Sequence, residues 1–271
     1  MSLRGTCGIV LRVAGHGESD KLVTLYCPDL GRVTGIAKGA KKSKRRFVNK
    51  LEEFSLLHFF YRPPRGAAGL FILSEAELLA AHLSLRTSFQ RDANAMYLCE
   101  LVLRFTRDND PDPQIYTILK WALSALHQEE TPQKITVLTH LRLLGAVGYR
   151  PELSHCACCR QTVGPTRTYL FLPEAGVILC STCSSGQGNR SHCLSVQTLR
   201  LLANAQTFEL DRLHRLHFTQ QALAEAMPAL HHFTLHLLQH DVHSWNILRS
   251  LTSARTPSPG LSGPGKFLPR T

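Results

Sequence analysis

The first eighty residues alternate short apolar runs with turn residues, which is the pattern of a β-rich domain. Runs rich in Val, Ile, Leu, Phe and Thr occupy residues 8–13, 21–27, 32–38, 54–61 and 70–76. Gly, Pro and Asp stand in the breaks between these runs, where they favour turns. Five short strands with no helix-length segment between most of them predict a closed barrel over residues 1–80. The OB-fold is the five-stranded candidate.

The apolar spacing changes to a helical period from residue 88 onward. Apolar positions three and four residues apart predict helices over 94–106, 114–127, 133–146, 195–205 and 219–241. Asp112 before Pro113 is a typical helix start, and Gly148 is a typical helix stop. We therefore expect an α+β multidomain chain, in which an all-α helical domain made of residues 84–150 and 194–250 follows the barrel.

Two segments interrupt or follow the helical pattern. Residues 151–193 carry two short extended runs, 168–172 and 177–179, on either side of a turn. Residues 252–271 are rich in Pro, Gly and Ser and have no periodicity. The first segment is therefore predicted to be an insert in the helical domain, and the second a disordered tail.

The insert contains two Cys-x-x-Cys pairs, Cys156 with Cys159 and Cys180 with Cys183, with twenty residues between the pairs. Each pair places two thiolates on one side of a tight turn, and two such turns can close a tetrahedron around Zn²⁺. A closed four-thiolate site is structural, so we expect one structural zinc ion in a zinc ribbon. Disulfides and a redox couple are the alternatives. Cys158 competes with Cys159 for the metal, but adjacent ligands would strain the turn.

Positive charge dominates the chain. Lys and Arg outnumber Asp and Glu by 31 to 20, which gives a net charge of +11. A surplus of this size favours a polyanionic partner, most often nucleic acid. No secretory signal and no membrane-length apolar run is found. Nine cysteines without an export signal predict a protein of the reducing cytoplasm. The lack of a membrane-length apolar run predicts that the protein makes no membrane contact.

The positive charge is concentrated directly after the third predicted strand. Residues 38–50 contain seven cations and no acidic residue. The predicted nucleic-acid-binding residues are the first six of these: Lys38, Lys41, Lys42, Lys44, Arg45 and Arg46. Such a loop can displace the cations condensed on a phosphate backbone. A solvated loop that only aids solubility is the alternative, but the neighbouring barrel favours nucleic-acid binding.

No motif indicates an enzyme. Residues 35–43 match the spacing of a phosphate-binding loop poorly, and residues 108–119 lack the glycine and the glutamate of a calcium loop. The fourteen histidines show no catalytic spacing. Four thiolates would also leave a zinc ion without an open coordination position. We therefore expect binding rather than catalysis.

The order of these parts resembles the bacterial RecO family, and so do several local motifs. Residues 8–26 look like the opening hairpin of the family, and residues 37–47 are similar to its basic Lys-Gly-Ala-Arg-like loop. Residues 148–159 and 171–183 match its zinc segment. The resemblance spans about residues 1–250. Glu53 departs from it by standing where a proline is frequent, and Val177 by standing where a second glycine is frequent.

The resemblance implies a function in DNA repair and recombination. RecO-like proteins bind single- and double-stranded DNA and anneal complementary strands. They also bind the C-terminal tail of single-stranded-DNA-binding protein (SSB) and, together with RecR, assist the loading of RecA on SSB-coated DNA. This implies a cytoplasmic, nucleoid-associated protein. An RNA-binding zinc adaptor without annealing activity is the alternative, because a barrel, a basic loop and a ribbon also suit RNA.

Overall fold

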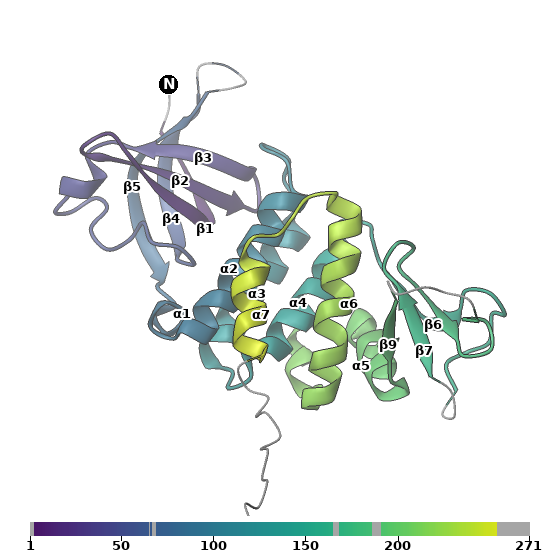
Figure 1. The fold of residues 1–271 in the computed structure, drawn as a ribbon. Coiled ribbons are helices and arrows are strands. Elements are labelled where there is room, and N and C mark those ends of the chain that lie inside the picture. The colour runs from purple at the N-terminus through teal and green to yellow at the C-terminus, as the bar shows by residue number, and fades with distance from the viewer. Residues whose placement is uncertain (1–2, 65, 67–68, 165–167, 186–190, 254–271) are drawn as a thin grey trace, which may run out of the picture.

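The computed structural model describes residues 3–64, 66, 69–164, 168–185 and 191–253. Three parts follow one another in space (Figure 1): a β-barrel, a group of helices beside it, and a small sheet beyond the helices. The barrel and the small sheet therefore lie at opposite ends of the molecule, with the helices between them.

The N-terminal part is a closed barrel of five strands. The strands are β1 (Arg4–His16), β2 (Asp20–Cys27), β3 (Gly31–Ala37), β4 (Leu56–Arg62) and β5 (Phe71–Ala80). Their order around the barrel is β1-β2-β3-β5-β4, and the β3–β5 pair is parallel. Each predicted strand is present, so the prediction of an OB-type barrel is confirmed.

The long strand β1 closes the barrel because it pairs with a different neighbour along each half. Its first half pairs with β4 and its second half with β2, and the register shifts between Val10 and Arg12. Such a shift bends a strand and increases its twist. Alternation then separates an inner face, on which Val23 and Leu25 are fully buried, from an outer face that carries Thr24.

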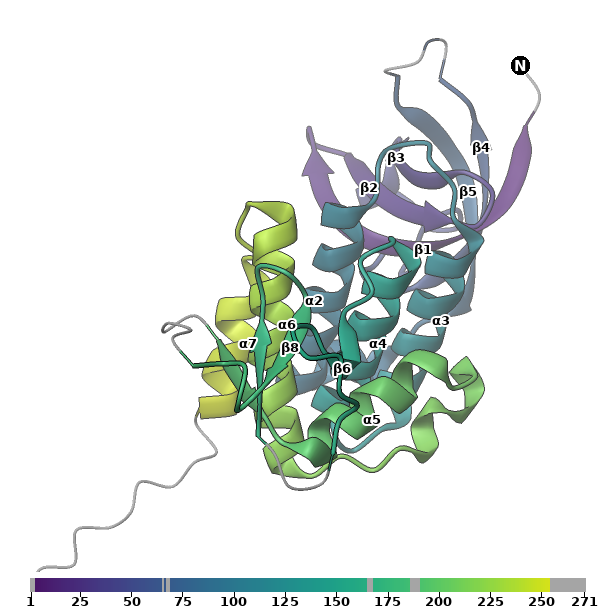
Figure 2. The same ribbon diagram turned by 90° about the vertical axis from the view of Figure 1, so that its right-hand side faces the viewer.

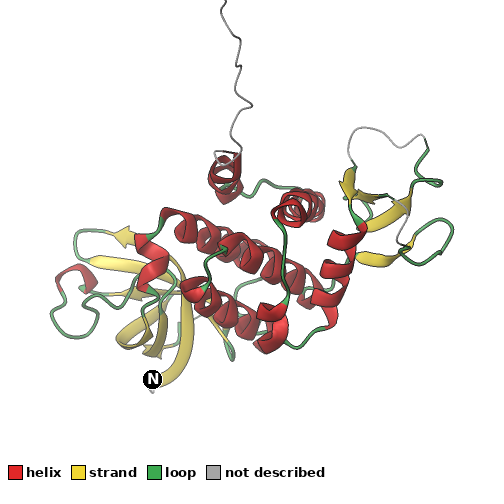
Figure 3. Ribbon diagram, turned by 90° about the horizontal axis from the view of Figure 1, so that it is seen from below, coloured by secondary structure: helices red, strands yellow, loops and turns green. Residues whose placement is uncertain are grey.

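The helices that follow form the centre of the molecule. They are α1 (Leu83–Thr87), α2 (Phe89–Phe105), α3 (Pro113–Gln128), α4 (Pro132–Ala146), α5 (Val196–Thr207), α6 (Gln220–Leu238) and α7 (Ser244–Ser253). Two 3-10 helices, η1 (Ala40–Lys42) and η2 (Leu210–Arg215), complete the described helices. Helix α4 packs against α2, α3 and α6, and α7 packs on α2 (Figures 2 and 3). The prediction of a helical domain after the barrel is therefore confirmed.

Side-chain caps fix the starts of several helices. Asp112 Oδ1 accepts hydrogen bonds from the backbone amides of Gln114, at 2.8 Å, and Ile115. Ser195 Oγ accepts one from the amide of Thr198 at 3.2 Å. These bonds satisfy donors that have no partner inside a helix, which is why the sequence signals at these positions predicted the helix starts correctly.

Several predicted boundaries were wrong, and one helix was missed. The predicted helix 219–241 ends at Leu238, because Gln239 adopts a left-handed backbone conformation (φ 54°). A separate helix, α7, then runs to Ser253, so the predicted tail does not begin at residue 252. The short helix α1 was not predicted at all. The rest of the predicted tail, residues 254–271, lies outside the described residues.

The segment between α4 and α5 forms the small sheet. Its strands are β6 (Glu152–Cys156), β7 (Tyr169–Leu172), β8 (Val177–Cys180) and β9 (His192–Leu194), in the order β6-β8-β7-β9. The predicted hairpin corresponds to β7 and β8, whereas β6 and β9 were not predicted. The sheet rests on α6, where Phe171 meets Phe233 edge to face with ring centroids 6.0 Å apart.

Among the helices that the structure describes, none combines the length and the apolar character needed to cross a membrane.

Candidate metal centre and nucleic-acid interface

The basic segment, defined here as residues 38–50, projects from the end of β3. Lys38, Lys41, Lys42, Lys44, Arg45 and Arg46 are all exposed, and η1 lies within the segment. Figure 1 shows this part of the chain at the end of the barrel that points away from the helices. The structure thus brings the six predicted DNA-binding cations together on one exposed loop.

Hydrogen bonds hold the start of the basic segment against the turn between β1 and β2. Gly39 adopts a left-handed conformation (φ 68°), and its amide donates to Asp20 Oδ1 at 2.8 Å. This bond, more than any other contact, lowers the pKa of Asp20. Lys41 donates from its amide to Ser19 O at 2.9 Å and from Nζ to Gly17 O at 2.8 Å. The segment therefore has a defined path and is not merely tethered at its ends.

Two apolar side chains anchor the later part of the segment. Phe47 and Leu51 are 3% and 1% exposed, and Phe47 belongs to the barrel core. Arg46 covers the Phe47 ring, with its guanidinium carbon 5.3 Å from the ring centroid. Because Phe47 is buried, it cannot stack on a base, and its role is to fix the backbone that carries the cations.

The six cations have little internal compensation. None of them forms a salt bridge with another residue that the structure describes, whereas the neighbouring Lys21 pairs with Glu52 at 3.1 Å. The carboxylate of Asp20, beside the segment, is engaged through Oδ1 by Gly39. The segment therefore presents unpaired positive charge to the solvent, which is the property that a polyanion requires.

The four predicted zinc ligands lie together in the small sheet. The Sγ atoms of Cys156, Cys159, Cys180 and Cys183 are all within 4.8 Å of one another. Cys156 ends β6 and Cys180 ends β8, so the parallel pairing of these strands brings the two Cys-x-x-Cys turns face to face. The prediction of this set of four is confirmed as a cluster that can hold one metal ion.

Hydrogen bonds favour the thiolate form of two of the four cysteines, whereas the neighbouring Cys180 side chain raises the pKa of Cys183. Burial acts to raise the pKa of Cys156, but hydrogen bonds from the backbone amides of Cys159, Cys180 and Cys158 outweigh it and lower that pKa to about 6. The Cys180 amide, for example, donates to Cys156 Sγ at 3.4 Å. Hydrogen bonds also lower the pKa of Cys180, and the bond from the Cys183 amide has the largest effect. Thiolates are the form in which cysteine binds a metal.

The spacing of the cluster also fits a tetrahedral ion. A Zn–S bond of about 2.3 Å places tetrahedral sulfur atoms about 3.8 Å apart. The Sγ atoms of Cys159 and Cys180 are 3.9 Å apart. Cys158 is exposed and does not belong to the cluster of four, which agrees with the expectation that Cys159, and not Cys158, faces the metal.

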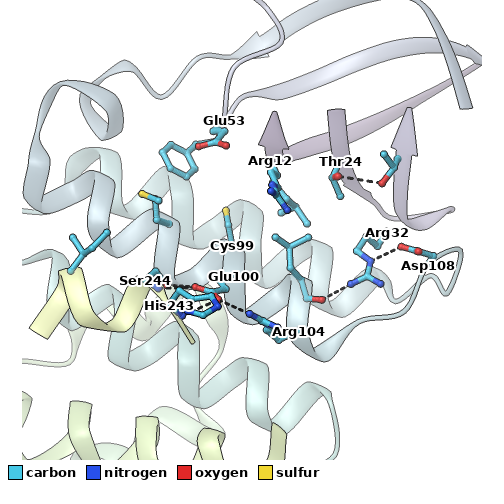
Figure 4. Close-up of a pocket in the computed structure, with 16 residues that line it drawn as sticks. Arg12, Thr24, Arg32, Glu53, Cys99, Glu100, Arg104, Asp108, His243 and Ser244 are labelled. Carbon is cyan, nitrogen blue, oxygen red and sulfur yellow. Dashed lines mark hydrogen bonds and ion pairs between the residues drawn. The ribbon is translucent and has the colours of Figure 1, made fainter. Parts of the chain in front are cut away.

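A cleft that the sequence did not predict lies between the barrel and the helices. Its volume is about 730 Å³, and its walls come from β1–β3, α2 and the start of α7. Three arginines from distant parts of the chain, Arg12, Arg32 and Arg104, line it together (Figure 4). No local signal identifies such a set, because only the packing of the barrel against α2 brings these residues together.

The fold and these sites define a class of protein: a barrel of the OB type with an exposed basic segment, joined to a helical domain that carries a four-cysteine cluster able to hold a metal. Family models match both parts of the chain. The model described as "Recombination protein O N terminal" matches residues 1–82, and "Recombination protein O C terminal" matches residues 86–246. The chain belongs to the RecO family of DNA repair proteins.

Three relatives support this assignment. The chain is similar to the DNA repair protein RecO of Syntrophobacter fumaroxidans, with 33% identity over 80% of this chain and 86% of the relative. It is 30% identical to the RecO of Syntrophus aciditrophicus over 90% of this chain and 94% of the relative. The RecO of Listeria monocytogenes is 29% identical over 79% of this chain and 81% of the relative. The similarity therefore covers most of both chains.

Proposed function

We propose that this protein is a recombination mediator that binds single- and double-stranded DNA and anneals complementary strands. The observation that carries the proposal is the basic segment: six exposed cations without a salt-bridge partner among the described residues, on a barrel of the OB type. Lys38, Lys41, Lys42, Lys44, Arg45 and Arg46 contact the phosphate backbone. Membership of the RecO family supports DNA rather than another polyanion.

Annealing follows from charge neutralisation. Two complementary strands repel each other through their phosphates until cations screen them. A protein that supplies several cations releases condensed counterions, with a salt slope of about 0.7 per phosphate on single strands. A second strand then approaches a partly neutralised first strand, and base pairing completes the reaction without covalent chemistry. No catalytic residue is needed for this function.

The proposed partners follow from the family. With RecR, the protein assists the loading of RecA on SSB-coated DNA, and it binds the C-terminal tail of SSB. It works in the cytoplasm, at the nucleoid. An acidic tail would need a basic rim, and the high positive charge of the chain is compatible with such a contact.

We further propose that the metal is one structural Zn²⁺ ion. Cys156, Cys159, Cys180 and Cys183 would hold it, and four thiolates leave no open position for a substrate. The ion would fix the small sheet against α6. In this proposal the domains are the barrel (1–80), the helical domain (84–150 and 194–250) and the inserted zinc ribbon (151–193).

The test is annealing of two complementary oligonucleotides coated with SSB, with and without the protein, over a series of salt concentrations. Two matched variants each reverse three positive charges, one in the basic segment and the other in the helical domain. The triple variant K41E/K42E/R45E reverses the basic segment, and the control K120E/R212E/R215E reverses three exposed cations in the helical domain. We expect the first variant to lose annealing and to flatten the salt dependence of DNA binding, and the control to keep both.

Equal behaviour of the two variants would reject the basic segment as the main contact. Tight DNA binding without acceleration of annealing would reject the mediator function. In that case, stronger competition by RNA than by DNA would favour the RNA-binding zinc adaptor.

A further inference from the structure

The cleft between the barrel and α2 is not part of the basic segment, yet it lies at the other end of the same barrel face. Strand pairing shows this directly. Arg12 stands opposite Thr24, which stands opposite Thr34, on the outer face of β1–β3. The next outward row, two residues along each strand, is Ala14, Leu22 and Ile36.

The face therefore forms a continuous track. On β3, the outward positions lead from Arg32 in the cleft through Thr34 and Ile36 to Lys38, the first cation of the basic segment. Six residues of strand at about 3.3 Å each separate Arg32 from Lys38 by roughly 20 Å. Stacked single-stranded DNA covers that distance with about six nucleotides at 3.4 Å each, well within the roughly 4–16 nucleotides that an OB-fold binds.

The carboxylates of the cleft are already engaged by protein donors. Asp108 Oδ1 accepts from Arg32 Nε at 2.6 Å, and Glu53 Oε1 accepts from the Val13 amide at 3.2 Å. Glu100 accepts from the amide and the hydroxyl of Ser244 at 2.8 and 2.7 Å, and from Arg104 Nη2 at 3.3 Å. Their acceptor oxygens thus serve to hold α7 and the cleft walls in place.

The arginines of the cleft, by contrast, have N–H groups that donate to no acceptor among the described residues. Arg12 is exposed, and its guanidinium has no hydrogen-bond partner or ion pair in the part of the chain that the structure describes. Arg104 uses Nη2 for Glu100, and Arg32 uses Nε for Asp108 and Nη1 for the carbonyl of Leu103. Figure 4 shows Arg12 reaching from β1 toward α2. The N–H donors that remain free in the cleft therefore belong to positively charged arginines, which can bind an anion.

The cleft also has apolar lining residues, which are called the cleft floor here: Leu11, Phe54, Met96, Leu103 and Ile247. A volume of about 730 Å³ lies within the range of roughly 300–1,000 Å³ that is typical of sites for small organic ligands. An anionic group for the rim and a flat, weakly polar group for the floor are the two features that a nucleotide combines.

We propose that the cleft is a second contact site for single-stranded nucleic acid, in which Arg12 and Arg104 hold phosphates and the apolar floor receives a base. One strand would run from the basic segment along the outer face of β1–β3 into the cleft. The inference rests on the proposed DNA-binding function and extends it to helix α2, because Arg104 makes the helical domain a part of the interface. A single strand suits this site, because a base can enter the cleft only when it is not paired and stacked inside a duplex.

The experiment uses the full chain and a fluorescent 20-nucleotide oligothymidylate, with affinity measured by anisotropy over a salt series. The variant Arg12→Gln removes the uncommitted cation, and Arg212→Gln removes an exposed arginine of η2 far from the cleft as the control. We expect Arg12→Gln to bind several-fold more weakly, with a salt slope lower by about 0.7 for one lost phosphate contact. The control keeps the affinity and the slope of the wild type.

Photo-crosslinking of the wild-type protein supplies a measurement that does not depend on any substitution. An oligothymidylate carrying one 4-thiothymidine should crosslink to residues of the cleft floor, such as Met96 or Ile247, when the modified base lies about six nucleotides from those that crosslink to the basic segment. Absence of such crosslinks, together with unchanged binding of Arg12→Gln, would overturn the proposal. If the cleft proposal were overturned in this way but K41E/K42E/R45E lost DNA binding, the proposed function would stand and only the cleft site would fail. If the wild type bound no oligonucleotide, the proposed function itself would fail.

Discussion

Gly176 lies so close to the ring of Phe233 that a Cβ atom at residue 176 would stand 2.7 Å from Cζ of Phe233. Gly176 closes the turn between β7 and β8, and Phe233 belongs to α6, so this contact joins the small sheet to the helical domain. The backbone of Gly176 is left-handed (φ 64°), a conformation that residues with a side chain rarely adopt. The position therefore excludes other residues for two independent reasons.

Gly176→Ala should destabilise the protein by about 2–5 kcal/mol, because it adds backbone strain to overpacking. Thermal unfolding measures the change. Gly145→Ala is the matched control: Gly145 lies in α4, where an added Cβ atom would meet no neighbouring group within 4 Å, and alanine favours the helix. The control should raise stability by about 0.5–1 kcal/mol. Equal effects of both substitutions would contradict the role of the Gly176–Phe233 contact.

Removing the metal should unfold the small sheet. Elemental analysis should find one zinc ion per chain in the wild type and in Cys158→Ser, and less than one in Cys180→Ser. Metal binding contributes on the order of 10 kcal/mol in small zinc modules, so a chelator should lower the thermal stability of the ribbon strongly. Replacement by Co²⁺ should give the absorption bands of a four-thiolate site. Full zinc content in Cys180→Ser would reject the assigned ligands.

Two buried histidines should make the helical domain sensitive to acid. Burial lowers the pKa of His140 to about 3, and burial, followed by the charges of His140, His232 and Arg249, lowers that of His231 to about 3. His140 Nε2 lies 2.6 Å from Thr234 Oγ1, and His231 stacks on Trp245 with ring centroids 3.9 Å apart. Both side chains are therefore held neutral inside the fold.

The sign of the effect follows from proton uptake. In the unfolded chain each histidine has an ordinary pKa of about 6.5, so between about pH 6.5 and 3 the unfolded state binds more protons than the folded state. The contribution of the two neutral histidines to the free energy of unfolding is therefore fully present above about pH 6.5. It falls as the pH drops, by about 1.4 kcal/mol per pH unit for each histidine. Urea unfolding at pH 7, 6 and 5 measures this. His140→Asn should reduce the slope by about half of the two-histidine contribution, and an unchanged slope would contradict the assignment.

Phe47 should be needed for the shape of the basic segment. Its side chain is 3% exposed, so Phe47→Ala should cost about 3–5 kcal/mol of stability through the cavity that it leaves in the barrel. The adjacent Val48 is 44% exposed, and Val48→Ala should change stability by no more than about 0.5 kcal/mol. Denaturant unfolding of the two variants makes the comparison. A similar, small effect of both would show that the segment is not anchored by Phe47.

Local patterns in the sequence determined much of this protein. Alternation of apolar residues predicted the barrel strands, because one face of each strand must be buried. Asp112 and Ser195 marked helix starts, because their side chains bind amides only two or three residues away. The Cys-x-x-Cys spacing identified the four clustered cysteines, because a tight turn places both thiols on one side.

Other features depended on contacts between segments far apart in the chain, and no local pattern specified them. Helix α7 is held by Glu100 of α2, which accepts hydrogen bonds from residues 243 and 244, more than 140 positions away. Arg12, Arg32 and Arg104 meet in one cleft only because the barrel packs against α2. The sequence by itself thus determined the barrel strands, the main helices and the cysteine cluster, whose interactions are mostly local. Only the tertiary structure decided the cleft and the place of α7, because long-range packing fixes both.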